Sequence, residues 1–150
     1  MINDYLTRAA TGQSPARTKK ILLVDDSLTT LLMARTILGE SPNLTVFTAG
    51  DGEEAVRVAM EEKPDLILMD VVMPRMNGVQ ACRIIRASSG LNGIPIILVI
   101  ARGVDDLVIG GYASGCTAYI TKPLNPAELM ALVEAHLGEE VTKIIGPNNG

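Results

Sequence analysis

The sequence predicts an α/β protein, a doubly wound parallel sheet of five strands with helices on both faces. Short apolar runs alternate with longer amphipathic segments, the pattern of repeated strand–helix units. Most of the runs lack polar alternation, as expected of strands covered on both faces. Three of them end next to charged residues, at the edge where open α/β sheets bind ligands. These three observations together predict both the fold class and the position of a site.

Composition and length favour a single globular domain. The chain has 150 residues, of which 47% are hydrophobic and 20% charged, enough for a core and too apolar for disorder. Aromatic residues make up only 3%, so the core is expected to be aliphatic. Linker-like composition before the first strand predicts an N-terminal extension over 1–18, a domain over 19–138 and a tail over 139–150.

The sequence of the first half of the domain predicts three strands and two helices. The apolar run 21–24 is the first strand, and Ser27 is expected to cap a helix over 28–38. That helix should bury a stripe formed by Leu28, Leu31, Leu32, Ile37 and Leu38. Run 44–49 is the second strand, and a glycine-rich turn leads into a helix over 53–62 with Ala55, Val56, Ala59 and Met60 inward. Pro64 ends that helix, and run 65–69 is the third, central strand.

The second half continues the alternation. After a loop come a helix over 79–87, with Ala81, Ile84 and Ile85 apolar, and an apolar fourth strand over 94–100. A helix near 105–114 contains Gly110 and Gly111 and is expected to be the least stable element. A short fifth strand over 118–120 precedes a helix over 126–137, which Pro126 opens.

Four charged residues follow the predicted strands: Asp25, Asp26, Asp70 and Lys122. If the first and third strands are neighbours, the three carboxylates converge, and they raise one another's pKa unless a cation neutralises them. Mg²⁺ suits such a site of oxygen ligands. Lys122 can pair with a carboxylate or a phosphoryl oxygen. Each residue alone could be a turn former or a cap, but their joint occurrence favours a site that accepts a phosphoryl group on Asp70.

Three segments, 21–27, 68–78 and 119–123, resemble the signature segments of the receiver domain of two-component response regulators. The resemblance covers about 19–137 and implies the strand order 2-1-3-4-5. It implies that Asp70 is the phosphoacceptor for a histidine kinase and that Lys122 contacts the phosphoryl group. It further implies Mg²⁺ held by Asp26, Asp70 and the backbone carbonyl of Val72, with Asp25 acting largely through water. A cis Lys122–Pro123 peptide and a switch role for Tyr119 follow from the same resemblance.

One position departs from the family pattern. The fourth strand of such domains usually ends in Ser or Thr before Ala, whereas this chain has Ile100-Ala101. The missing hydroxyl normally bonds the phosphoryl group, and such a bond is worth roughly 1.5–3 kcal/mol. We therefore expect phosphorylation of Asp70 to persist and its coupling to Tyr119 to be weakened or rerouted.

The leading hypothesis is a stand-alone receiver, not an enzyme, that is phosphorylated by a sensor histidine kinase or phosphotransfer protein and controls an unidentified output protein. A phosphorylation-independent interaction scaffold is the alternative. A phosphatase or flavin protein is disfavoured, because no glycine-rich phosphate loop follows the first strand and no second Asp lies two residues beyond Asp70. The net charge of −4 and the lack of a helix-turn-helix after 137 argue against nucleic-acid binding. We expect a cytoplasmic location without membrane insertion, and Cys82 and Cys116 show no metal-ligand spacing.

Overall fold

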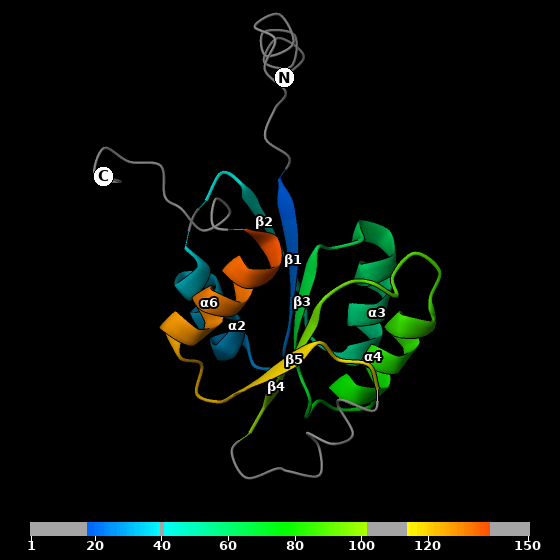
Figure 1. Ribbon diagram of the computed structural model, residues 1–150. Helices are drawn as coiled ribbons and strands as arrows, with labels where there is room; N and C mark the ends of the chain where they lie inside the picture. The colour runs from blue at the N-terminus through cyan, green and yellow to red at the C-terminus, as the bar shows by residue number, and fades with distance from the viewer. Residues whose placement is uncertain (1–17, 40, 102–113, 139–150) are drawn as a thin grey trace, which may run out of the picture.

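A computed structural model describes residues 18–39, 41–101 and 114–138, and this part contains one five-stranded parallel sheet. The strands are β1 (Lys19–Val24), β2 (Leu44–Ala49), β3 (Leu66–Asp70), β4 (Ile96–Ile100) and β5 (Ala118–Thr121). Their order across the sheet is β2-β1-β3-β4-β5 (Figure 1). The predicted fold class and strand order are confirmed, and each strand lies within two residues of its predicted bounds.

Four helices are described: α2 (Leu28–Leu38), α3 (Gly52–Glu62), α4 (Gly78–Ala87) and α6 (Pro126–Leu137). Each begins after a polar residue whose side chain accepts a hydrogen bond from the first turn. These capping residues are Ser27, Asp51, Asn77 and Asn125. Since every cap sits just beyond a strand or a loop that follows one, capping starts each helix close to the edge of the sheet.

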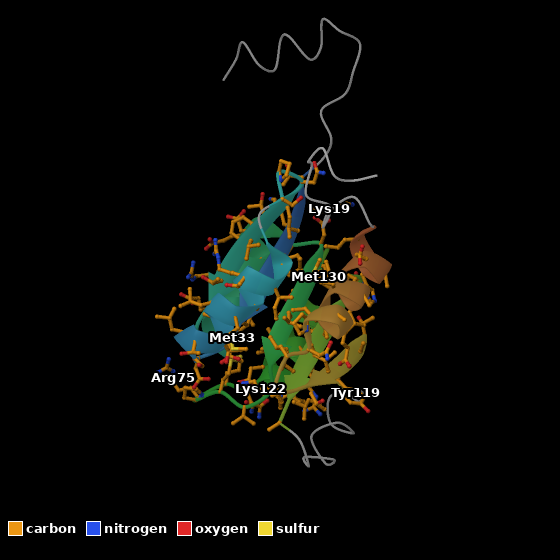
Figure 2. All side chains as sticks on the ribbon, turned by 90° about the vertical axis from the view of Figure 1, so that its left-hand side faces the viewer. Lys19, Met33, Arg75, Tyr119, Lys122 and Met130 are labelled. Carbon is orange, nitrogen blue, oxygen red and sulfur yellow. The ribbon has the colours of Figure 1, made fainter. Side chains whose placement is uncertain are left out.

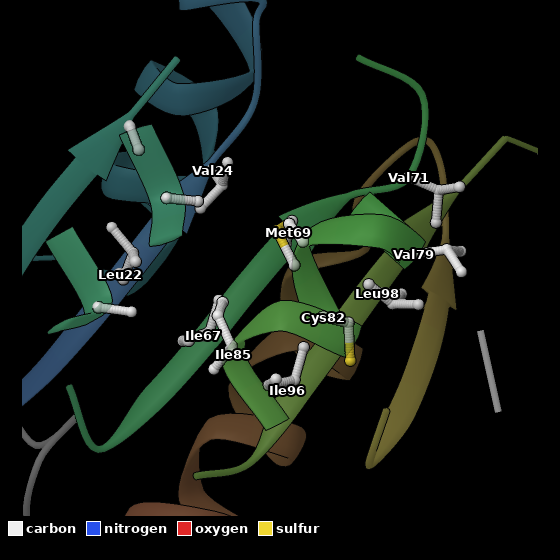
Figure 3. Close-up of a cluster of buried hydrophobic side chains, with 14 of the residues drawn as sticks. Leu22, Val24, Ile67, Met69, Val71, Val79, Cys82, Ile85, Ile96 and Leu98 are labelled. Atoms are coloured by element: carbon white, nitrogen blue, oxygen red, sulfur yellow. The ribbon is translucent and has the colours of Figure 1, made fainter. Parts of the chain in front are cut away.

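The helices form two layers, one on each face of the sheet. In Figure 1, α2 and α6 cover one face, whereas α3 and α4 cover the other. Side chains alternate along β3, so Ile67 and Met69 join the core beneath α3 and α4, while Leu66 and Leu68 join the core beneath α2 and α6. Figure 3 shows the first of these cores, in which aliphatic side chains of the central strands pack against Val79, Cys82 and Ile85 of α4. The expectation of an aliphatic core is therefore confirmed.

The predicted inward stripe of α2 is partly wrong. Ala34 and Leu38 are buried, but the side chains of Leu28 and Leu32 are 70% and 55% exposed. The apolar residues of this helix extend beyond one face, so their spacing does not identify the inward face, and packing against the sheet selects it. Met60 of α3 and Ile84 of α4 are also exposed, although their neighbours Ala59 and Ile85 are fully buried.

Several predictions fall on residues 1–17, 102–113 and 139–150, which lie outside the described residues. They include the N-terminal extension except for Thr18, nearly all of the helix near 105–114, and the tail. Among the described helices, none combines the length and apolar character that crossing a membrane requires. Cys82 and Cys116 carry free thiols.

Candidate functional site

The backbone places three of the predicted site residues at one edge of the sheet. Asp70 is the last residue of β3, and Asp25 directly follows β1, where its N–H donates to Ala49 O (3.1 Å). Lys122 directly follows β5, and its N–H donates to Ile100 O (2.9 Å). These bonds continue the parallel ladders by one residue, so the side chains leave the sheet at its carboxyl edge. Figure 2 shows Lys122 at this end of the molecule and Lys19 at the opposite end.

The Lys122 ammonium connects two of the acids. Its Nζ lies 3.2 Å from Asp25 Oδ2 and 3.2 Å from Asp70 Oδ2. Both carboxylates are buried, whereas Asp26 is exposed. One carboxylate oxygen from each of Asp25, Asp26 and Asp70 lies within 4.8 Å of the others. The structure therefore brings together all four charged residues that the sequence singled out.

The remaining oxygens of the buried acids have backbone donors. Asp25 Oδ1 accepts from Ser27 N–H (2.8 Å), and Asp70 Oδ1 accepts a longer bond from Val72 N–H (3.4 Å). Within the described residues, no buried side-chain nitrogen or oxygen lacks a hydrogen-bond partner. Each buried carboxylate is thus oriented by one lysine contact and one backbone contact, while its side chain stays close to the neighbouring acid.

The charges of this cluster shift the pKa of both Asp70 and Lys122. Burial and then the charge of Asp25 raise the pKa of Asp70, and Lys122 offsets only part of this effect. Burial alone would lower the pKa of Lys122, but the charges of Asp70 and Asp25 and the hydrogen bonds to them outweigh it and raise that pKa. The Lys122 ammonium therefore stays charged, but its single positive charge does not neutralise the carboxylates around it.

The donor set fits a hard divalent cation. Three carboxylates gather around one ammonium, and a single positive charge cannot neutralise them. Their oxygens lie close enough to share one ion, and Asp26 is exposed, so a partly hydrated ion has access to solvent. Mg²⁺ prefers this combination of a few carboxylates with retained water.

Ile100 and Tyr119 lie on the same face of the sheet. Leu98 and Ile100 belong to the core beneath α3 and α4, and Leu98 is in register with Tyr119 of the neighbouring strand. The side chain of Ile100 is 2% exposed and that of Tyr119 is 41% exposed. Ile100 is therefore a core side chain at the end of β4. The Lys122–Pro123 peptide is cis, as the resemblance implied.

Sequence reasoning missed one ion pair next to the site. Arg75, in the loop that follows Asp70, places its Nη2 2.8 Å from Oδ2 of Asp51, the residue that caps α3. The two residues are 24 positions apart. No local pattern in the sequence marks Arg75 as the partner of Asp51.

Comparisons with known proteins agree with this geometry. Residues 21–134 match the family model described as response regulator receiver domain. The sequence is 40% identical over 120 residues to the DNA-binding response regulator MtrA of Mycobacterium tuberculosis, covering 79% of this chain and 50% of that protein. It is also 40% identical over 121 residues to the alkaline phosphatase synthesis transcriptional regulatory protein PhoP of Bacillus subtilis, covering 79% and 48%. The chain thus spans about half the length of the curated relatives it matches.

Solved structures show the same fold. The chemotaxis protein CheY4 of Vibrio cholerae superimposes with a TM-score of 0.73 at 32% identity, covering 80% of this chain and 99% of that one. The receiver domain of the sensor histidine kinase PA1611 of Pseudomonas aeruginosa superimposes with a TM-score of 0.72 at 31% identity, covering 81% and 98%. That structure has a magnesium ion coordinated in its active-site cleft.

Proposed function

Because this chain belongs to the response regulator receiver domain family of two-component signalling, we propose that it is a phosphorylation-controlled switch. Receiver domains are signalling modules that bind Mg²⁺ in an acidic pocket. The phosphoacceptor proposed here is Asp70, and the donor is a sensor histidine kinase or a phosphotransfer protein. The observation that carries the proposal is the shared ammonium of Lys122, 3.2 Å from both buried carboxylates beside the exposed Asp26.

The proposed metal ligands are the carboxylates of Asp26 and Asp70 and the backbone carbonyl of Val72, with Asp25 acting largely through water. Bound Mg²⁺ would supply positive charge that neutralises the acids and the oxygens of the incoming phosphoryl group. The convergence of the three carboxylates supports this assignment. So does the Val72 N–H bond to Asp70, because it ties the backbone of that loop to the acceptor side chain.

The transfer itself needs an ionised and oriented Asp70. A carboxylate oxygen of Asp70 forms a bond to phosphorus, and the bond from phosphorus to the donor nitrogen of the histidine breaks. Lys122 can interact with both reacting groups, the carboxylate of Asp70 and the incoming phosphoryl group. It offsets part of the rise that burial and Asp25 cause in the pKa of Asp70, and it can contact a phosphoryl oxygen while retaining its contact with Asp25.

We propose that the phosphorylated state is transmitted in an atypical way. Ile100 offers no hydroxyl to the phosphoryl group, so the phosphorylated state loses one charge-assisted hydrogen bond to the end of β4. This loss is worth roughly 1.5–3 kcal/mol, or about ten- to a hundred-fold in the switching equilibrium. Tyr119 shares the face of Ile100 and is the proposed aromatic switch residue.

The proposed output is a partner-binding event in the cytoplasm controlled by the state of Asp70. The curated relatives are named as DNA-binding or transcriptional regulators, and DNA binding is not assigned to this chain, which matches only about half of each. A second candidate is a phosphorylation-independent scaffold. The burial of Ile100 in the core favours it, because the end of β4 is packed where relatives carry a hydroxyl.

The test is to incubate the protein with acetyl phosphate and Mg²⁺ and to measure the intact mass. We expect the gain of one phosphoryl group in the wild type and in Glu128→Gln, which changes an exposed acid in the first turn of α6. We expect no gain in Asp70→Asn or without Mg²⁺. Absence of any gain in the wild type, together with no spectral response to beryllofluoride and Mg²⁺, would favour the scaffold.

A further inference from the structure

The loop between β3 and α4 contains a strained turn. Arg75 has a φ of +65°, in the left-handed region that side-chain-bearing residues rarely adopt. The Met76 N–H donates to Pro74 O across it (2.8 Å). A hydrogen bond between the residues on either side of a central residue defines a γ-turn, and a central residue of positive φ gives the rare and strained form of this turn. Strain of this kind persists only where surrounding contacts hold it in place, and it clusters at functional sites.

One such contact is the ion pair between Arg75 and Asp51. Arg75 Nη2 lies 2.8 Å from Asp51 Oδ2, while Asp51 Oδ1 accepts a hydrogen bond from Glu54 N–H (2.8 Å) as the cap of α3. One carboxylate oxygen of Asp51 therefore caps α3, and the other binds Arg75 of the loop. The backbone bond from Glu54 and then Arg75 hold the pKa of Asp51 below its usual range, so the carboxylate is charged at neutral pH.

The backbone of the loop also lies very close to the first turn of α3. A Cβ atom added at Gly52, the first residue of α3, would lie 2.5 Å from Met76 O. At the other end of the loop, Gly78 N–H donates to Val71 O (2.8 Å). The loop is thus anchored beside Asp70 and against the first turn of α3, with Arg75 between these two anchors.

We infer that the Arg75–Asp51 pair positions the loop that carries Val72, and that it thereby prepares the backbone carbonyl of Val72 to bind Mg²⁺. This inference rests on the proposed function, which assigns that carbonyl to the metal. A loop ordered in advance loses little conformational freedom when the ion binds. Both residues act through the loop and are positioning residues. The alternative is an exposed ion pair that contributes only a little to stability.

The test measures the affinity for Mg²⁺ by titration calorimetry at low ionic strength. Arg75→Ala and Asp51→Asn should each raise the Kd about two- to five-fold, the range of an exposed ion pair. Asn caps helices as well as Asp does, so Asp51→Asn removes the charge and keeps α3 intact. The double variant should be no weaker than either single variant, because both remove the same contact. Arg75→Lys should recover part of the affinity.

Arg57 of α3, the helix that Asp51 caps, provides a matched control. Arg57 pairs with Glu54 (3.5 Å) and Glu61 (3.2 Å) on the surface of α3, both pairs lying within that helix. Arg57→Ala should leave the Kd for Mg²⁺ unchanged. Amide hydrogen exchange of the metal-free protein should become faster at Val72 and Met76 in Arg75→Ala and Asp51→Asn, but not in Arg57→Ala.

The outcomes separate this inference from the function on which it rests. Wild-type protein that does not bind Mg²⁺ would refute the proposed function. Wild-type protein that binds Mg²⁺, with unchanged Kd in the single variants or with additive losses in the double variant, would refute only the positioning role. If Arg75→Ala does not fold, Asp51→Asn alone still decides, because an unchanged Kd in that variant overturns the inference.

Discussion

Lys122 Nζ lies 3.2 Å from Asp70 Oδ2, although 52 residues separate the two in the chain. The same ammonium lies 3.2 Å from Asp25 Oδ2. A single positive group thus supports two buried carboxylates, and a third acid is close by. The close approach of these acids around one ammonium is therefore a cost to the folded state without a further cation.

The first prediction concerns pH and Asp70. Burial and the charge of Asp25 raise the pKa of Asp70 in the folded protein above its unfolded value. The folded state then holds the proton more tightly, so stability falls as the pH rises from the ordinary carboxyl range through the raised pKa. Asp70→Asn cannot ionise and should escape this loss. In the metal-free protein, thermal unfolding should show a higher Tm for Asp70→Asn at neutral pH and a smaller difference near pH 4.

Magnesium should reduce the difference in Tm between Asp70→Asn and the wild type at neutral pH. An ion that binds the folded state stabilises it more when it binds more tightly, and Asp70→Asn lacks one proposed ligand. The wild type should therefore gain more in Tm on addition of Mg²⁺ than Asp70→Asn does. Equal gains in both proteins would contradict a metal role for Asp70.

The second prediction concerns Lys122→Met. Removing the ammonium leaves Asp25 and Asp70 buried without their shared partner, so we expect a loss of about 1–3 kcal/mol in the free energy of unfolding without metal. Denaturant titrations with and without Mg²⁺ measure it. The loss should shrink when Mg²⁺ is present, because the ion supplies the missing positive charge. A loss that is the same in both conditions would show that Lys122 stabilises the fold by packing alone.

The third prediction compares Ile100→Thr with Ile100→Val. Ile100 is buried in the core beneath α3 and α4, so Ile100→Val should cost about 0.5–1.5 kcal/mol. Ile100→Thr should lower the free energy of unfolding more than Ile100→Val does. Thr has nearly the same shape as Val, but it buries a hydroxyl. Only Thr can bond the phosphoryl group. Beryllofluoride with Mg²⁺ should therefore shift the NMR signals of Tyr119 further in Ile100→Thr than in Ile100→Val, and equal shifts would refute the proposed coupling.

The fourth prediction concerns the close approach of Gly78 to the end of β3. A Cβ atom at Gly78 would lie 2.4 Å from Asp70 O, so the loop or the strand must move to admit it. Gly78→Ala should cost about 1–3 kcal/mol and slow the phosphorylation of Asp70. Gly93→Ala is the matched control, because nothing lies within 4 Å of its added Cβ. Chemical denaturation and the rate of mass gain with acetyl phosphate measure the two effects, and equal behaviour of both variants would contradict the argument.

Local signals in the sequence determined most of the fold. The unbroken apolar runs marked strands covered on both faces, and Ser27 and Pro126 marked helix starts to within a residue. The positions of Asp25, Asp70 and Lys122 just past their strands placed them at one edge, because all strands of a parallel sheet end on the same side. The strand order came from the family resemblance and not from these local signals.

Tertiary structure decided what depends on contacts between distant segments. Packing against the sheet turned Leu28 and Leu32 of α2 outward, although they are as apolar as the residues it buried. The sharing of Lys122 between two carboxylates and the pairing of Arg75 with Asp51 likewise appear only in three dimensions. Periodicity reports the environment along one element. Which faces meet, and which charges come within hydrogen-bonding distance, depends on how all the elements pack together.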